Sequence, residues 1–243
     1  MSRHVFRITG QEARHFLQNL VTNDVDQLDH GLVYTALLTP QGKYLADFFL
    51  VPEADAILVD ADSSLAPMLL QRLNMYKLRA KVTIEETGLQ VRRGTGPMPE
   101  GAFADPRDAA LGWRLYGADN GDDGSDWDAI RVARCIPETG IELTPDSYIL
   151  EAGFDRLNGV DFRKGCYVGQ EVTARMKHKT ELRKGLRVVE IDGSAPAGTP
   201  IMAGEKEAGT LFTSAGNRAI AYLRFDRAGG EMTAGSARLR LLS

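Results

Sequence analysis

The sequence has 243 residues, of which 43% are hydrophobic and 26% are charged, as is typical of a globular protein with a sizeable core. A net charge of −4 argues against general nucleic-acid binding, and no apolar run approaches the roughly 20 residues that a membrane helix requires. Two cysteines cannot form a disulfide framework, and the first residues lack the apolar core of a signal peptide, so we predict a cytoplasmic location, with an organelle after import as the alternative.

The first half of the chain alternates helices and strands. Thr9-Gly10-Gln11-Glu12 is typical of a capping box at the start of a helix, and apolar residues follow at helical spacing as far as Val21. Strands are predicted over 33–38 and 44–51, joined by a type I turn at Thr39-Pro40-Gln41-Gly42, and again over 56–60. A second helix is predicted from Ser63 or Ser64, followed by a strand over 80–85. This order predicts an α+β fold.

The second half of the chain is broken by glycine. Stretches rich in Gly and Pro at 94–101, and in Gly and Asp at 117–128, predict loops around a strand over 111–116, with a helix over 126–134. From 185 to 243, short alternating runs separated by glycines predict a small antiparallel β-barrel. We therefore predict two parts, residues 1–180 and residues 181–243.

Reactive side chains are concentrated in the segment 164–171, which reads Lys-Gly-Cys-Tyr-Val-Gly-Gln-Glu. Cys166 follows Lys164 by two residues, and a nearby cation raises the thiolate fraction of a cysteine. A helix-like run begins near Gly169, and its amino-terminal dipole would add to this effect. The alternative is a buried structural cysteine beside a turn, but the clustering of Lys, Gly, Gln and Glu favours a functional thiol.

The segment 163–187 carries a local positive charge, with eight basic and two acidic residues. Such a field suits an anionic ligand or partner, and a solvated basic face is the alternative. Asp47 lies within a strongly apolar strand, where a carboxylate needs a partner or a purpose unless it faces solvent. The four histidines do not fall at metal-ligand spacings, and two isolated cysteines cannot hold a four-thiolate iron–sulfur cluster, so we expect no intrinsic metal centre.

The segment 164–171 matches the Lys-Gly-Cys-Tyr-x-Gly-Gln-Glu motif of the YgfZ family at every fixed position. The chain resembles these bacterial folate-binding proteins, which are related to the aminomethyltransferase (T-protein) of the glycine cleavage system. Their mitochondrial relatives act in iron–sulfur cluster assembly. Further segments that resemble the family cover most of the chain: 16–25, 38–43, 76–82 and 136–140.

The resemblance implies two interlocked α+β subdomains around a central channel that binds tetrahydrofolate in the related enzymes, followed by the barrel. It implies a folate-binding accessory protein that supports iron–sulfur cluster assembly or repair in client enzymes, with folate and client or assembly proteins as partners. The positions matching functional ones are Cys166 and Lys164 for chemistry. Those expected to hold tetrahydrofolate or a derivative, or the loop beside it, are Asp47, Arg131, Tyr167, Gln170, Glu171 and Arg175.

The chain also departs from the related aminomethyltransferases. Ala46-Asp47 stands where they carry an Asp-Asp pair, and no counterpart of their pterin-contacting Glu lies near Trp113. Cys135 stands where the family usually has Gly. These losses argue against aminomethyl transfer from a lipoyl carrier and leave two alternatives. One is a true folate-dependent one-carbon transferase of the aminomethyl type, acting on tRNA or a small amine, and the other is a scaffold in which the basic segment docks a partner and Cys166 is buried.

Overall fold

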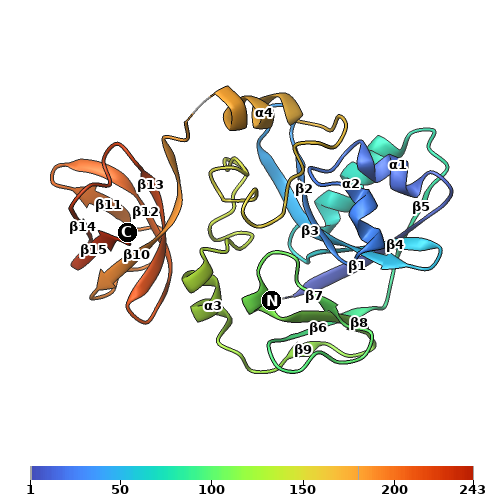
Figure 1. The fold of residues 1–243 in the computed structure, drawn as a ribbon, viewed down its shortest axis with the longest axis horizontal. Coiled ribbons are helices and arrows are strands. Elements are labelled where there is room, and N and C mark those ends of the chain that lie inside the picture. The colour runs from blue at the N-terminus through green and yellow to red at the C-terminus, as the bar shows by residue number, and fades with distance from the viewer. Residues whose placement is uncertain (1, 180, 243) are drawn as a thin grey trace. The chain divides into compact units, whose positions relative to one another are not determined.

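The computed structural model describes residues 2–179 and 181–242, and the chain forms two compact units (Figure 1). Unit 1 comprises residues 1–125 and 154–172, and unit 2 comprises residues 126–153 and 173–243. The predicted boundary at residue 180 falls on a residue outside the described part of the chain.

Unit 1 is built on a five-stranded antiparallel sheet with the strand order β2-β3-β4-β1-β5. The hairpin predicted around Thr39–Gly42 is confirmed, and the Gly42 N–H donates to the Thr39 carbonyl at 2.8 Å. The strand β1 was not predicted, because Arg3, His4 and Arg7 interrupt its apolar pattern. The five strands are β1 (Arg3–Thr9), β2 (Val33–Leu38), β3 (Tyr44–Glu53), β4 (Ala56–Asp62) and β5 (Thr83–Glu86).

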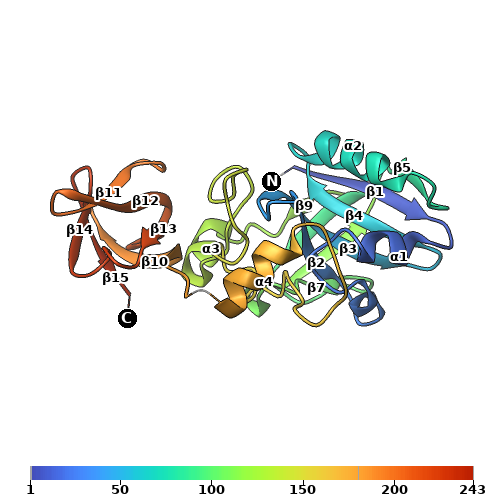
Figure 2. The same cartoon turned by 90° about the horizontal axis from the view of Figure 1, so that it is seen from above.

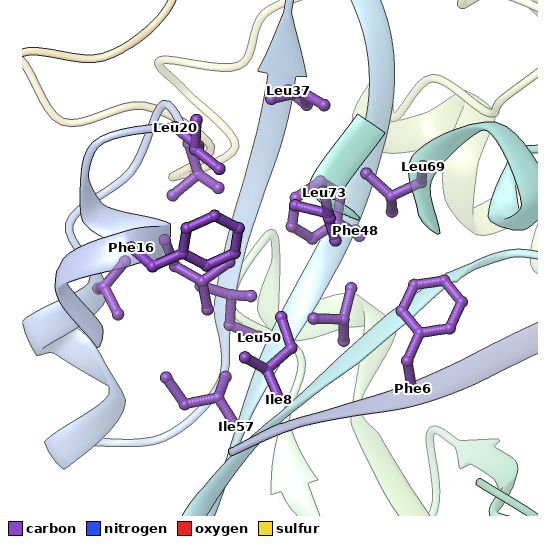
Figure 3. Close-up of a cluster of buried hydrophobic side chains, with 14 of the residues drawn as sticks. Phe6, Ile8, Phe16, Leu20, Leu37, Phe48, Leu50, Ile57, Leu69 and Leu73 are labelled. Carbon is purple, nitrogen blue, oxygen red and sulfur yellow. The ribbon is translucent and has the colours of Figure 1, made fainter. Parts of the chain in front are cut away.

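One face of this sheet is covered by two helices, α1 (Ala13–Gln18) and α2 (Ala66–Lys77), with the 3-10 helix η1 (Val25–Asp29) beside them (Figure 2). Alternate residues of each strand point at the helices, as the two-residue period of a strand requires. Figure 3 shows the resulting core, in which side chains from four strands and both helices meet. Its labelled members are Phe6, Ile8, Phe16, Leu20, Leu37, Phe48, Leu50, Ile57, Leu69 and Leu73.

The predicted capping box at the first helix is wrong. Thr9 is the last residue of β1, and Glu12 is the residue before α1 without a side-chain cap. The Glu12 carboxylate instead accepts a hydrogen bond from the Lys81 N–H at 2.5 Å, so it ties the helix start to the segment before β5. The spacing of Thr and Glu is the same in both arrangements, and only the tertiary contact distinguishes them.

The opposite face of the sheet carries a buried polar network. Asp60 of β4 accepts hydrogen bonds from Arg3, Arg114 and Tyr116. Burial alone would raise the pKa of Asp60, but the two guanidinium groups outweigh it and hold the pKa below its usual range. Arg114 and Tyr116 belong to a second sheet of order β7-β8-β6-β9, with η2 (Ala109–Leu111) beside it. Its strands are β6 (Gln90–Gly94), β7 (Phe103–Ala104), β8 (Trp113–Gly117) and β9 (Gly121–Asp122).

Unit 2 contains the helix α3 (Trp127–Arg134) and a closed six-stranded barrel of order β10-β13-β12-β11-β14-β15, as the curled strands in Figures 1 and 2 show. The predicted barrel is confirmed, although β11 and β14 were not foreseen because each has only four residues. Its core is made of Val, Ile, Leu, Ala and Met side chains. The strands are β10 (Lys184–Asp192), β11 (Pro200–Ala203), β12 (Lys206–Ala215), β13 (Arg218–Arg224), β14 (Glu231–Ala234) and β15 (Ala237–Leu241).

Candidate functional site

The segment 164–171, which we call the signature loop, packs against the β2–β3 turn of unit 1. A Cβ added at Gly169 would lie 2.6 Å from the Thr39 carbonyl oxygen and 3.1 Å from the Gly42 Cα. Gly169 also has a φ of +84°, a conformation that favours glycine. A Cβ at Gly42 would in turn lie 2.8 Å from the Cβ of Val172. The motif therefore requires a glycine here because two backbones approach closely.

Lys164 anchors the amino end of the signature loop. Its ammonium is buried and donates to the carbonyl oxygens of Gln18 at 2.7 Å and Val21 at 2.5 Å. Gln18 is the last residue of α1, where a helix leaves carbonyls without partners and favours a cation, and Val21 lies three residues beyond it. Burial lowers the pKa of Lys164 to about 8, although the charges of Asp24 and Asp161 oppose this shift. The ammonium thus caps a helix.

Cys166 is exposed, whereas Lys164 and Tyr167 on either side of it are buried. The Lys164 Nζ lies 5.2 Å from the centroid of the Tyr167 ring, a cation–π contact that closes the loop on itself. Val168 packs against the hydrophobic core of unit 1. The alternative in which Cys166 is buried is wrong. The loop holds its neighbours and leaves the thiol in solvent.

The helix expected from Gly169 is confirmed as α4 (Gln170–Lys179). Gln170 is half-buried, and its N–H donates to the Tyr167 carbonyl at 3.3 Å. Glu171 and Arg175 are exposed on α4 at a spacing of four residues, with the acid nearer the amino end, which is the favourable order. Gln170 and Glu171 belong to unit 1 and Arg175 to unit 2.

Asp47 is confirmed as a buried carboxylate with partners. Its two oxygens accept from the Tyr44 hydroxyl at 2.6 Å and the Tyr34 hydroxyl at 3.0 Å. Burial raises the pKa of Tyr34 well above its usual value, and the nearby charge of Asp47 adds to the rise. The pairing shifts between Leu37 and Leu38, so Leu45 is an extra residue on β3. This bulge brings Tyr44 and Asp47 to one face, which the alternating pattern alone does not reveal.

Arg131 lies in unit 2, whereas Asp47 and Cys166 lie in unit 1. Its guanidinium is buried among the protein's own acceptors. The ion pairs join it to Glu138 at 2.9 Å, Glu142 at 3.1 Å and Asp128 at 3.2 Å. It also donates to the Ile136 carbonyl and to Thr213 of β12. Each guanidinium nitrogen therefore already contacts a protein oxygen.

The sequence analysis did not identify Glu142, a buried acid that pairs with Arg131. Glu142 is buried, pairs with Arg131, and accepts from the Thr213 hydroxyl at 2.5 Å and the Glu138 N–H at 2.9 Å. It therefore joins the segment after α3 to the barrel within unit 2. The signal was weak, because a single Glu in a polar loop is most often exposed.

The described residues contain no group of three or more His, Cys, Asp and Glu side chains that could hold a metal ion. The signature loop supplies one exposed thiol, one carboxylate at Glu171 and a rigid backbone. One thiol on a held loop can form a disulfide, a covalent adduct or a single metal bond.

Comparison with known proteins identifies the family of the chain. Residues 183–243 match the family described as CAF17, C-terminal beta-barrel domain. The chain is 31% identical to the mouse iron–sulfur cluster assembly factor IBA57, mitochondrial, over 95% of this chain and 78% of that protein. The chain belongs to the IBA57 family of iron–sulfur cluster assembly factors. The human IBA57 is 29% identical over the same shares, and the Mycosarcoma maydis homologue is 32% identical over 82% of this chain and 57% of its own length.

The IBA57 proteins are mitochondrial relatives of the kind that the resemblance to the YgfZ family implied. Membership of the YgfZ family itself stays a prediction. The structure is similar to the glycine cleavage system aminomethyltransferase T from Bartonella henselae, with a TM-score of 0.79, 14% identity, and coverage of 99% of this chain and 83% of that one. At this identity the similarity confirms the fold alone, an aminomethyltransferase-like α+β region followed by a barrel.

The prediction of a cytoplasmic location is wrong in view of this family. The mouse, human and Mycosarcoma maydis relatives are all named as mitochondrial. A sequence with two cysteines and no disulfide framework indicates a reducing compartment but does not distinguish one such compartment from another, so the composition alone led to this error. Within the described residues, no helix has the length and apolar character needed to cross a membrane.

Proposed function

We propose that this IBA57-family chain supports iron–sulfur cluster assembly by presenting the Cys166 thiolate to a cluster that it shares with a partner protein. The observation that carries the proposal is the exposure of Cys166 between two buried neighbours, Lys164 and Tyr167. A thiol that is to reach a cluster on another protein must lie in solvent. A thiol that is to bind it repeatedly in one geometry must be held by rigid surroundings.

The number of thiols decides between holding a cluster and sharing one. Two-iron and four-iron clusters are held by about four cysteine thiolates. The signature loop provides one, and the chain has one further cysteine, Cys135. The remaining ligands therefore come from a partner or a small thiol, and the cluster is cargo. This arrangement suits transfer, because a cluster bound by one ligand from this chain is released easily.

The other signature residues position the thiol. Lys164 fixes the loop to α1, and the close approach of Gly169 to Gly42 fixes it to the β2–β3 turn. Glu171 in the first turn of α4 is placed where the helix dipole stabilises an acid. We propose Lys164 as a positioning residue that acts through the loop.

The test is complementation in cells that lack this protein, with the activity of an endogenous four-iron enzyme such as an aconitase as the readout. Wild type and Cys135→Ala should restore the activity, and Cys166→Ala should not, at equal protein levels. Thermal melting of each purified variant shows that the fold is retained. Full restoration by Cys166→Ala would show that the thiol is not needed and would end the proposal.

Folate binding is a second candidate, supported by the aminomethyltransferase-like fold and by Asp47 at the position where the related enzymes have an acidic pair. The residues proposed to contact tetrahydrofolate are Asp47, Tyr167, Gln170, Glu171, Arg131 and Arg175. The hydroxyl contacts of Asp47 and the ion pairs of Arg131 mean that binding must exchange existing contacts. A tetrahydrofolate titration of wild type and Asp47→Asn tests it. Equal affinities would remove Asp47 from the site, and no binding by wild type would reject the candidate.

We also propose that residues 181–243 form a domain separate from residues 1–180. The six barrel strands, from Lys184 to Leu241, support this division. Residues 126–153 pack with the barrel in unit 2, so a barrel fragment beginning at residue 181 would lack the Arg131–Glu142 contacts. Expression of that fragment, judged by its melting transition, tests whether the barrel folds alone.

A further inference from the structure

The segment Met75–Lys81 at the end of α2, which we call the Leu78 turn, exposes an apolar side chain in a strained backbone. Leu78 is 87% exposed and has a φ of +40° and a ψ of −101°. The Ala80 N–H donates to the Lys77 carbonyl at 2.7 Å and closes a four-residue turn. These angles lie near the first central position of a type II′ turn, where glycine is the preferred residue.

Neither the exposure nor the strain is explained by the fold of unit 1. A leucine in the left-handed region strains the backbone, and strained residues cluster at binding sites and switches. The side chain gains no burial in return, because it points into solvent. Met75, one helical turn earlier, is also largely exposed. Both features are accounted for if Leu78 is buried in a complex.

The turn is held in place. The Lys81 N–H donates to the Glu12 carboxylate, and a Cβ added at Gly10 would lie 2.1 Å from the Lys81 carbonyl oxygen, so the backbones of the two segments pack directly. The position of Leu78 is therefore defined before any partner binds. A preorganised apolar side chain suits a pocket of defined shape, since binding then requires little ordering.

The charge around Leu78 indicates the partner's chemistry. Lys77, Arg79 and Lys81 alternate along the turn, and no acidic residue lies between Met75 and Val82. Arg79 and Lys81 are exposed. We propose that the Leu78 turn docks a partner protein that has an apolar pocket rimmed by carboxylates. A lipid surface would also attract cations and leucine, but it requires no fixed turn, so the strained geometry favours a protein.

The location also suits a protein that handles a cluster. The Leu78 turn is tied to the amino end of α1 through Glu12, and Lys164 is tied to its carboxyl end. A helix of six residues is about 9 Å long, and one side of a standard interface covers about 800 Å². Both ends of α1 therefore fall within one footprint. This last link rests on the proposed function, whereas the docking itself does not.

The experiment introduces a photo-cross-linking residue, Leu78→p-benzoylphenylalanine, in the full chain in cells. Met98, an exposed methionine elsewhere in unit 1, receives the same residue as the control. The protein cross-linked at position 78 and not at 98 is then purified and titrated with the metal-free chain. We expect Leu78→Gly, which suits the turn and keeps the fold, to weaken binding at least tenfold. Arg79→Glu should weaken it similarly, and Met98→Ser should leave it unchanged.

Three results would overturn the proposal. Position 78 could yield no more cross-linked protein than position 98, or Leu78→Gly could bind as wild type does. The chain could also sediment with phosphatidylserine vesicles in a Leu78-dependent manner while the purified protein does not bind, which would assign the turn to a membrane surface. Because Cys166→Ala should not change this affinity, a failure of the cluster proposal is distinguishable from a failure of the docking proposal.

Discussion

The Lys164 ammonium donates a hydrogen bond to the Gln18 carbonyl at 2.7 Å, so the lysine of the signature loop caps the last residue of α1. A second bond, to the Val21 carbonyl at 2.5 Å, holds the segment that follows the helix. The loop that carries Cys166 is therefore anchored to α1 by the buried ammonium of Lys164.

The pH dependence of stability tests the environment of Lys164. Its pKa is lowered from 10.5 to about 8, mainly by burial, so the unfolded chain binds more protons than the folded chain between these values. The free energy of unfolding should therefore rise with pH across this window, by up to about 1.4 kcal/mol per pH unit. Below the folded-state pKa, Lys164 is charged in both states and the cost of burying its charge is fully present.

The measurement compares urea unfolding of wild type and Lys164→Met at steps through that pH range. Subtracting one curve of unfolding free energy against pH from the other removes the contributions of the other titrating groups. Lys206→Met, which removes an exposed lysine of the barrel, is the matched control and should run parallel to wild type. If the curve of Lys164→Met also ran parallel to that of wild type, this would contradict a buried Lys164 amine with a lowered pKa.

The two glycines of the signature loop should respond differently to alanine. Gly169→Ala forces a Cβ to 2.6 Å from the Thr39 carbonyl and occupies a φ of +84°. We expect it to lower the free energy of unfolding by about 3 kcal/mol. A Cβ at Gly165 meets no atom within 4 Å, so Gly165→Ala should stay within about 0.5 kcal/mol of wild type. Equal effects in chemical denaturation would show that the close approach is absent.

The Asp47 cluster can be tested by a double-mutant cycle. Tyr44→Phe removes a donor 2.6 Å from a buried carboxylate and should cost about 2 kcal/mol. Asp47→Asn should cost a similar amount. The loss of stability in the double variant should be smaller than the sum of the two single losses, because both changes remove the same hydrogen bond. Additive costs in equilibrium unfolding would show that the two side chains do not interact.

Cys135 occupies a conformation that favours glycine. It ends α3 with a φ of 51° and a ψ of 48°, the left-handed region. Replacing it with glycine should raise the free energy of unfolding by about 1 kcal/mol, because the Cβ strain is removed. Cys135→Ala retains a Cβ and serves as the control, with little change expected. Thermal melting distinguishes the two, and a loss of stability in Cys135→Gly would indicate that the thiol makes a stabilising contact.

The fold was largely readable from local patterns. Alternation and the Thr39–Gly42 turn predicted the β2–β3 hairpin, and regular turn signals predicted the barrel, because both depend on residues near each other in sequence. The charged strand β1 and the contact of Glu12 with Lys81 were not readable, since each depends on a distant partner. The motif located the exposed thiol, but only the structure shows that Lys164 caps α1 and that Arg131 is engaged by Glu138 and Glu142.

The bulge at Leu45 is a further feature that could not be predicted from the sequence pattern. It places Tyr44 and Asp47 on one face of β3, so one of the two donors to the carboxylate lies only three residues away in the sequence. A pattern with a strict period of two places them on opposite faces. Asp47 was therefore identified as a site without its partners.

The central claim is that Cys166 binds a cluster as cargo. The most direct measurement incubates the purified chain, without oxygen, with a two-iron cluster assembled from iron, sulfide and glutathione, and then follows alkylation of each cysteine by mass spectrometry. We predict that the cluster protects Cys166 in proportion to the visible absorption retained by the protein, that Cys135 is not protected, and that Cys166→Ser retains no absorption. Equal cluster retention by Cys166→Ser and wild type would contradict the claim.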